Sequence, residues 1–479
     1  MEDSLKSRAL GGLFWSFLDG VGLQGVRLII TIILARILQP EVFGQIAMVI
    51  VVILLAKSVI NSGFSAAIIR KKDLTHRDEC SVFYFNIVTA FIIIPILYYL
   101  APDMAIFYSV PDLSLIIRAL SLIVIFESLS NVHIALLTKR INFKTQLKAN
   151  LISYSISGAI GIIAAYNGFG IWSLVLQLVG HSLLQTILLW LLHDWRPSLV
   201  FSISSLKDMF PFGSRLFVSG ILDTVFNNIY FVVIGKVFTV ADVGYYSRAK
   251  GLQELPVSSL SMVVGRVTFP VFCEVQDDKA KLKRGVRQSL VGIATISFPI
   301  MVGMAIVAEP LVKVLLTDKW LPSVFYLQLL CVVGLFYPLS AVNLNVLKSQ
   351  GRSDLFLRLE IIKKMLVAAS VYITYRWGIN AMILGAITTS IISYFLNTYY
   401  TEKLINYSIV EQLADLVPVV FITAIMGFSV FYIQSYTFSS EMVLLISQIL
   451  LGISIYALLS LFFRRHFFVS VVTTLFKTR

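Results

Sequence analysis

Residues 42–69 read VFGQIAMVIVVILLAKSVINSGFSAAII and contain a single charged residue, Lys57. This stretch is longer than the roughly 20 apolar residues that an α-helix needs to cross a bilayer. It is followed at once by three basic residues at positions 70–72. Because such clusters mark the cytoplasmic ends of spanning helices, the stretch predicts a membrane helix that ends inside the cell.

The rest of the chain shares this composition. Of its 479 residues, 58% are hydrophobic and only 14% are charged, whereas a soluble domain carries roughly a quarter charged residues. The three cysteines, Cys80, Cys273 and Cys331, lie far apart and show no metal-binding spacing. So large an apolar surplus cannot fit one soluble core, and it indicates an all-α polytopic membrane protein.

Apolar runs separated by polar turns predict about fourteen transmembrane helices. The first run follows Lys6 and Arg8, but it contains Asp19 and Arg27 and has no cleavage site, so we expect a retained helix and not a signal peptide. The predicted spans are residues 13–37, 42–69, 81–101, 113–137, 149–166, 169–193, 213–238, 245–273, 288–315, 322–347, 358–377, 379–400, 413–434 and 441–463.

Basic residues fall almost entirely in alternate loops. One set of loops holds clusters such as residues 70–72, 139–140 and 279–287, whereas the other set holds mostly single basic residues at helix ends. Since cytoplasmic loops are enriched in Lys and Arg, we expect both termini in the cytoplasm. The same asymmetry explains the net charge of +13 without nucleic acid as a partner.

The two halves of the chain carry a weak internal repeat. Residues 12–45 align with residues 212–245 at an offset of 200, which matches Phe17 with Phe217, Gly20 with Gly220, Ile29 with Ile229 and Gly44 with Gly244. The offset pairs the first span with the seventh, so both copies cross in the same direction. We therefore predict two parallel six-helix lobes, residues 1–210 and 211–405, and two further helices in residues 406–479, as in some alternating-access transporters.

Charged residues inside these spans are the candidates for function, because each costs about 2.5–3.5 kcal/mol at the bilayer centre. The candidate cavity residues for substrate binding or coupling are Arg27, Lys57, Asp19, Glu127, Arg118, Arg215, Asp223 and Arg266. Arg27 and Lys57 lie too deep to reach the interface, and cations outnumber anions in the first lobe's interior. Unpaired cations there favour an anionic ligand, and a guanidinium suits bidentate phosphate binding.

For several of these residues a structural role is the alternative. Asp19 and Glu127 are equally consistent with buried ion pairs, whereas snorkelling to the interface is the favoured interpretation for Arg215, Arg248 and Lys250. His133 and His181 stand without a partner at metal-ligand spacing, and for His181 a packing role is favoured over proton transfer.

The stretch GVGLQG at residues 20–25 matches the dinucleotide-binding fingerprint. No strand precedes it and it lies inside a spanning helix, so we interpret its glycines as a helix-packing or flexibility feature.

Three segments resemble polysaccharide flippases of the Wzx type, in the multidrug/oligosaccharidyl-lipid/polysaccharide exporter superfamily. They are ILARILQPEVFG (residues 33–44), SGFSAAIIRKKD (residues 62–73) and ALLTKRINF (residues 135–143). The resemblance is nearest to the colanic-acid and teichuronic-acid exporter branch. It extends from about residue 5 to at least residue 400 and is most specific in the first lobe.

This resemblance implies a flippase of the bacterial inner membrane, which moves an undecaprenyl-pyrophosphate oligosaccharide to the periplasmic leaflet for exopolysaccharide, capsule or O-antigen synthesis. It implies a cationic cavity between two lobes, where Arg27 and Lys57 would fall, and coupling to a proton or sodium gradient as proposed for the superfamily. No cofactor is expected. The expected partners are the lipid-linked substrate, membrane lipids and polysaccharide polymerase or assembly proteins, and a monomer suffices because the repeat supplies two lobes.

Two other functions are left open. A multidrug exporter of the same superfamily that handles organic cations should carry an acidic interior, whereas this one is basic. A membrane-embedded polysaccharide polymerase or ligase would use the same lipid-linked substrate. Such enzymes usually carry a substantial exterior loop, whereas the exterior segments here, such as residues 102–112 and 435–440, are short.

Overall fold

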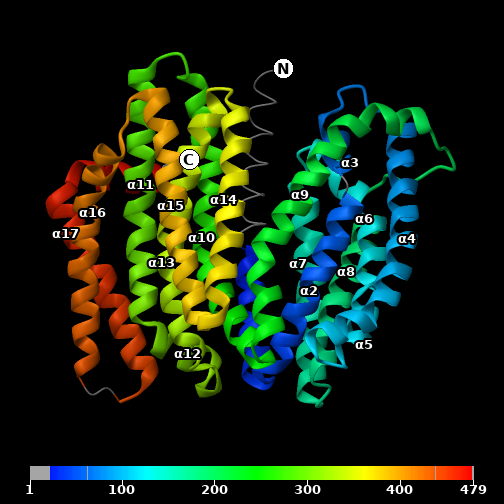
Figure 1. Cartoon of the computed structure of the whole chain (residues 1–479), viewed down its shortest axis with the longest axis horizontal. Helices are drawn as coiled ribbons and strands as arrows, with labels where there is room; N and C mark the ends of the chain where they lie inside the picture. Colours follow the sequence, from blue (N-terminus) through cyan, green and yellow to red (C-terminus); the bar gives the residue numbers. More distant parts are fainter. Residues whose placement is uncertain (1–21, 62, 437–438, 477–479) are drawn as a thin grey trace. The chain divides into compact units, whose positions relative to one another are not determined.

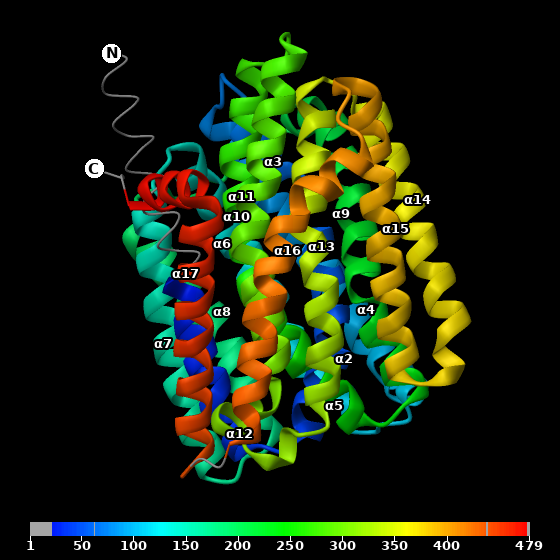
Figure 2. The same ribbon diagram turned by 90° about the vertical axis from the view of Figure 1, so that its left-hand side faces the viewer.

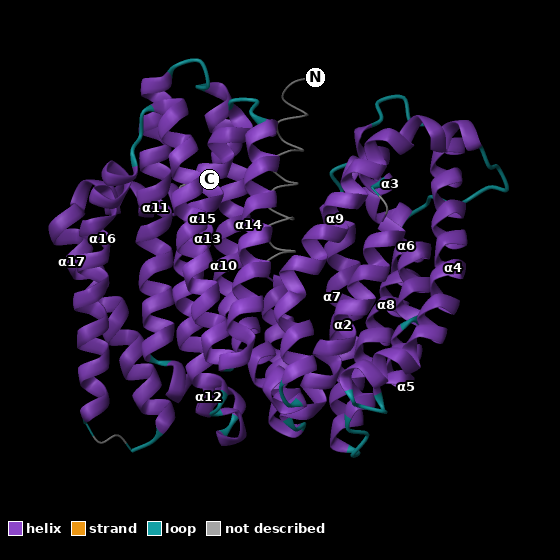
Figure 3. Cartoon of the chain, in the orientation of Figure 1, coloured by secondary structure: helices purple, strands orange, loops and turns teal. Residues whose placement is uncertain are grey.

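The computed structural model describes residues 22–61, 63–436 and 439–476, and every regular element in these ranges is helical (Figures 1 and 3). The chain divides by packing into two units, Met1–Gly244 and Tyr245–Arg479. The predicted three-part division, with boundaries near residues 210 and 405, stays a prediction.

In the first unit, α7 and α8 pack along each other, and α6 packs on both α8 and α4. The elements are a helix over residues 22–37, α2 (Pro40–Asn61), α3 (Phe64–Arg70), α4 (His76–Tyr108), α5 (Leu113–Leu120), α6 (Leu122–Lys139), α7 (Phe143–Tyr166), α8 (Ile171–Leu192), α9 (Ile203–Val237) and the first turn of α10 (Val240–Glu274).

In the second unit, α13 packs against both α11 and α15, and α16 lies beside α17 (Figure 2). After the rest of α10, the elements are α11 (Lys279–Ile306), α12 (Ala308–Leu316), η1 (Asp318–Trp320), α13 (Ser323–Ser349), α14 (Ser353–Thr374), η2 (Tyr375–Trp377), α15 (Ile379–Ile405), α16 (Ile409–Tyr432), η3 (Ile433–Ser435) and α17 (Glu441–Phe476).

Every predicted span overlaps a helix. Among the described residues, twelve helical segments are long and apolar enough to cross a membrane. The other two predicted spans are the helix over residues 22–37, whose predicted start lies outside the described residues, and α14, which carries four charges within its predicted span. The all-helical polytopic class is therefore confirmed, whereas the count of fourteen stays a prediction.

Many helices begin several residues before the predicted apolar runs, because their polar caps lie outside those runs. Thr75 and Asp78 form a capping box at the start of α4, and Ser408 and Glu411 form another at the start of α16. The Asp278 side chain accepts hydrogen bonds from two backbone N–H groups at the start of α11. These caps satisfy donors that the first helical turn leaves unpaired.

The apolar run at residues 42–69 is not one continuous helix. It is interrupted between α2 and α3, where Gly63 has a φ of 73°, a left-handed conformation that glycine adopts without steric cost. A Cβ atom on Gly63 would also collide with the backbone of Gly213 in α9. Glycine is therefore required at position 63 both for the turn and for the close approach of α9.

The repeat appears in the structure as a reciprocal contact within the first unit. The helices α2 and α10 begin at Pro40 and Val240, which are separated by the same offset of 200. A Cβ atom on Gly44 would overlap the Val240 carbonyl oxygen, and one on Gly244 would overlap the Pro40 carbonyl oxygen. Each glycine thus contacts the first residue of the helix that carries the other glycine. Such a reciprocal contact is typical of a two-fold interface, and it supports the repeat.

A buried hydrogen-bond network joins three helices of the second unit. The Gln412 side-chain oxygen accepts hydrogen bonds from Asn343 of α13 and from Tyr394 and Thr398 of α15, at 3.3, 3.0 and 3.4 Å. All four side chains are at most 1% exposed. Because an unsatisfied polar group in such a place is costly, this network fixes how α13, α15 and α16 pack.

We predict that Gly44→Ala destabilises the protein by about 1–3 kcal/mol, because its new methyl group must displace backbone atoms. Gly25→Ala is the matched control, since a Cβ atom there meets nothing within 4 Å and helix propensity favours alanine over glycine by about 1 kcal/mol. Thermal unfolding in detergent micelles measures both. Equal melting temperatures for wild type and Gly44→Ala would contradict the contact.

Candidate functional site

Lys57 of α2 and Glu127 of α6 form an ion pair within the membrane-spanning part of the first unit. The Lys57 Nζ lies 2.5 Å from Glu127 Oε1, and 28% and 22% of the two side chains stay exposed. We expected Lys57 to be unpaired, and that is wrong. For Glu127 we left open whether it forms a buried ion pair or serves the cavity, and the structure shows an ion pair. Since both side chains are partly exposed, the pair can still meet a ligand.

Arg27, in the helix over residues 22–37, is a cation whose charge is not balanced in this way. Its guanidinium lies 5.0 Å from the centre of the Tyr154 ring of α7, a cation–π contact. In the part of the chain that the structure describes, it forms no ion pair with a carboxylate. Asp19, which we predicted near the same helix face, lies outside the described residues. Arg27 therefore remains the clearest candidate to bind an anion.

His181 of α8 lies beside the Tyr154 ring that Arg27 contacts. The His181 Nδ1 lies 3.1 Å from the Ser153 hydroxyl, and its ring packs edge-on against Tyr154 at 4.8 Å. The hydrogen-bonded packing role that we favoured for His181 agrees with these contacts.

Polar side chains that we did not single out extend this neighbourhood. The Gln185 side chain donates a hydrogen bond of 2.5 Å to Asn150, and the Ser58 and Thr224 hydroxyls lie 3.0 Å apart. The signal was present in α7, where the polar residues Asn150, Ser153, Tyr154 and Ser157 share the i, i+3, i+4, i+7 spacing of one helix face.

The remaining predicted residues lie on α5, α9 and α10. Arg118 of α5 stacks on the Tyr98 ring at 4.1 Å, which is a cation–π contact. Asp223 is exposed on α9, next to Thr224. Arg215 and Arg266 lie on α9 and α10, and their side chains are outside the described residues. Their predicted roles stay predictions.

A second polar group lies where α8 ends. His133 and His193 face each other with Nδ1 atoms 3.0 Å apart, and they are 0% and 6% exposed. This partner lies 60 residues from His133 in the chain, so the local spacing of His133 did not reveal it. Burial, with Arg140 and Arg196 nearby, lowers the pKa of His193. Since no group of three metal ligands occurs among the described residues, we interpret the pair as structural.

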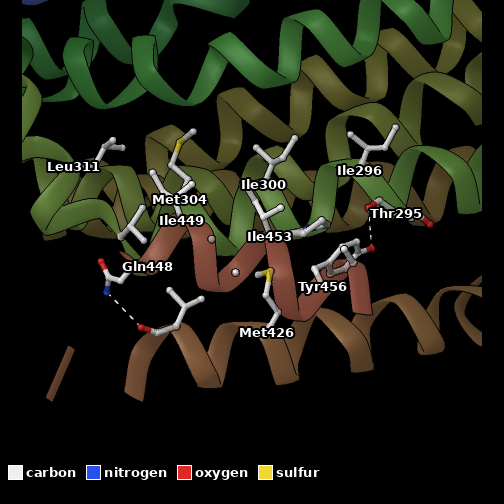
Figure 4. Close-up of a pocket in the computed structure, with 16 residues that line it drawn as sticks. Thr295, Ile296, Ile300, Met304, Leu311, Met426, Gln448, Ile449, Ile453 and Tyr456 are labelled. Carbon is white, nitrogen blue, oxygen red and sulfur yellow. Dashed lines mark hydrogen bonds between the residues drawn. The ribbon is translucent and has the colours of Figure 1, made fainter. Parts of the chain in front are cut away.

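The second unit contains an apolar groove between α11, α12, α16 and α17 (Figure 4). Its volume is about 560 Å³. Its two main polar side chains are engaged within the protein, since Gln448 donates to the Val430 carbonyl at 3.3 Å and Tyr456 donates to the Thr295 carbonyl at 2.8 Å. Such a lining suits hydrocarbon and not a polar headgroup.

The second unit also holds charges within a predicted span that we missed. Lys363 and Glu360 of α14 form an ion pair in which 15% and 28% of the side chains are exposed. With Arg358, Lys364 and Arg376, they place five charges inside the predicted span at residues 358–377. This charge density is the sequence signal that could have identified them.

The fold is shared with solved structures of membrane transporters. It resembles the solved structure of the lipid II flippase MurJ in an inward closed conformation, with a TM-score of 0.80 at 15% identity, over 95% of this chain and 99% of that one. It also resembles an inward-facing multidrug resistance MATE family transporter of the MOP superfamily, with a TM-score of 0.61 at 15% identity, over 79% and 94% of the two chains. At these identities the similarity concerns the fold alone.

The chain belongs to the polysaccharide biosynthesis protein family, whose model matches residues 33–325. It is 24% identical to the teichuronic acid biosynthesis protein TuaB of Bacillus subtilis, over 82% of this chain and 83% of that protein. It is 24% identical to the lipopolysaccharide biosynthesis protein WzxC of Escherichia coli, over 84% and 82%. The succinoglycan biosynthesis transport protein ExoT of Rhizobium meliloti matches at 26%, over 64% and 62%. The resemblance to Wzx-type flippases is confirmed.

We predict that Lys57→Met and Glu127→Gln each destabilise the protein by about 1–3 kcal/mol, less than a fully buried pair would, because 28% and 22% of the two side chains stay exposed. The double variant should recover at least about 1 kcal/mol, since no lone charge remains. Unfolding in detergent micelles measures this coupling. The exposed Arg352–Asp354 pair is the control and should show no measurable coupling. Additive single effects at Lys57 and Glu127 would argue against a structural contribution.

Proposed function

We propose that this protein is a flippase that carries an undecaprenyl-pyrophosphate oligosaccharide from the cytoplasmic to the periplasmic leaflet. Three findings support this. The chain belongs to a polysaccharide biosynthesis family, one relative is named a transport protein, and the fold is shared with a lipid II flippase. The product would supply a surface polysaccharide, by alternating access between two parallel lobes.

Arg27 carries the proposal. A guanidinium inside a spanning segment is costly unless it has a partner, water or a ligand. Its described contacts are with an aromatic ring and leave its charge unbalanced. A pyrophosphate offers the bidentate oxygens that a guanidinium prefers, and it links the sugar to the lipid in the proposed substrate.

The alternatives fit less well. A carrier of organic cations needs an acidic site, whereas the Lys57–Glu127 pair is neutral and Arg27 adds a positive charge. One relative is named a transport protein, and the solved structures that share the fold are transporters and not polymerases or ligases. We therefore propose a transporter and not an enzyme, with a polymerase and assembly proteins as downstream partners.

We further propose that the protein lies in the bacterial inner membrane with both termini in the cytoplasm. The twelve apolar helical segments support a multi-pass membrane protein. The alternation of basic loops supports the orientation. Coupling to a proton or sodium gradient belongs to the same proposal.

Arg27→Ala is expected to leave the protein inserted in the membrane and to abolish surface polysaccharide, because the pyrophosphate loses its main cationic contact. Polymer yield and membrane abundance in a strain lacking the native gene measure the two effects. Lys281→Ala removes a cation that is 68% exposed and should retain wild-type yield. Normal yield from Arg27→Ala would remove Arg27 from the mechanism.

Orientation can be tested by cysteine labelling after Cys80, Cys273 and Cys331 are replaced by alanine. An impermeant maleimide should label Asn167→Cys in cells whose outer membrane alone is permeabilised, because residue 167 is exposed in a predicted periplasmic loop. It should label Lys281→Cys only after the inner membrane is opened. The reverse pattern would invert the proposed orientation.

A further inference from the structure

We propose that Tyr154 is a positioning residue, which holds the Arg27 guanidinium in place for an anionic ligand. This inference rests on the proposed function, in which Arg27 binds the pyrophosphate of the substrate. The guanidinium carbon of Arg27 lies 5.0 Å from the centre of the Tyr154 ring. Arg27 is exposed whereas Tyr154 is half-buried, so the ring holds the guanidinium at a place that a ligand can reach.

An aromatic partner holds an arginine without accepting hydrogen bonds from its N–H groups. The attraction acts through the face of the ring and adds no negative charge, whereas a carboxylate or carbonyl accepts the donors that would otherwise bind a phosphate. Arg352 donates two hydrogen bonds to Asp354, and Arg196 donates three to backbone carbonyls. Within the described ranges, the Arg27 guanidinium makes no such hydrogen bond, so its donors remain for a ligand.

The Tyr154 ring is itself held by the neighbouring helix. The His181 ring of α8 packs edge-on against it, with the two ring centres 4.8 Å apart. His181 Nδ1 in turn lies 3.1 Å from the hydroxyl of Ser153, which precedes Tyr154 on α7. These contacts restrict the position of the Tyr154 ring before any ligand binds.

A close helix contact sets the register of Arg27 and Tyr154. About one turn further along both helices, a Cβ atom on Gly158 of α7 would lie 2.1 Å from the Ile30 side chain. The helix over residues 22–37 can approach α7 this closely because position 158 carries no side chain. Since residues three or four apart share a helix face, the same contact brings Arg27 over the Tyr154 ring.

A guanidinium that is ordered in advance binds an anion more tightly than a freely moving one. Immobilising a long side chain on binding lowers the affinity by roughly twofold to tenfold. The Tyr154 ring orders the Arg27 side chain before the ligand arrives. Without the ring, the ligand has to order this side chain itself, so the affinity for pyrophosphate should fall.

The test is titration calorimetry with inorganic pyrophosphate on the purified full-length protein in a nonionic detergent. Tyr154→Leu removes the ring and should weaken binding by about threefold to tenfold. Tyr154→Phe keeps the ring and should bind as the wild type does. A trifluorinated phenylalanine at position 154 keeps the ring's shape but withdraws electrons from its face, so it should bind at least about twofold more weakly than Tyr154→Phe. A purely structural role of the ring does not predict this last difference.

Phe212→Leu is the matched control. It removes the ring of another cation–π contact in the first unit, in which the Arg70 guanidinium lies 4.4 Å from the centre of the Phe212 ring. The affinity for pyrophosphate should stay unchanged in this variant. If Tyr154→Leu is not monodisperse, the comparison of phenylalanine with its trifluorinated form at position 154 decides the question by itself.

Wild-type affinity in Tyr154→Leu, or equal affinities with the two forms of phenylalanine, would overturn the positioning role and leave the flippase proposal standing. Binding by Tyr154→Phe as weak as that by Tyr154→Leu would also overturn it, because the hydroxyl and not the ring would then be required. An equal loss of affinity in Phe212→Leu would do the same, since the effect would not be specific to Arg27. Pyrophosphate binding that is absent from the wild type, or unchanged in Arg27→Ala, would overturn the proposed function and this inference together.

Discussion

A charged side chain in hydrocarbon requires a partner, and much of this structure follows from that constraint. Lys57 has Glu127 in the first unit, and Lys363 has Glu360 in the second. Arg27 is different, because its described partner is the Tyr154 ring, which contributes attraction but no balancing charge. An anionic ligand would therefore add a balancing charge at Arg27. The pyrophosphate linker of a lipid-linked sugar is such an anion.

The second constraint is close backbone approach. Gly44 packs against the carbonyl group of Val240 at the start of α10, and Gly244 packs against that of Pro40 at the start of α2. This contact therefore involves both copies of the repeat. Gly63 meets Gly213 in the same way at the break between α2 and α3. Because backbones can approach this closely only at glycine, these residues determine how closely the helices of the first unit pack at these contacts.

The helical plan could be predicted from sequence because the bilayer imposes a length on each apolar run. The helix ends were predicted less well, since caps such as Thr75 and Asp278 lie outside those runs. Partners remote in sequence could not be predicted at all. Glu127 is 70 residues from Lys57, and His193 is 60 residues from His133, and nothing in their local spacing reveals the pairing. The polar face of α7 and the charges of α14 could have been predicted from local spacing and composition.

The most direct test of lipid-linked sugar transport is to measure flipping in proteoliposomes that contain the purified protein. A fluorescent undecaprenyl-pyrophosphate oligosaccharide is placed in both leaflets, and an impermeant glycosidase removes the label from the outer one. If the protein is a flippase, nearly all of the substrate should become accessible to the glycosidase over time, whereas protein-free vesicles should protect about half of it. Protection of half the substrate in the presence of folded protein would contradict the proposed function.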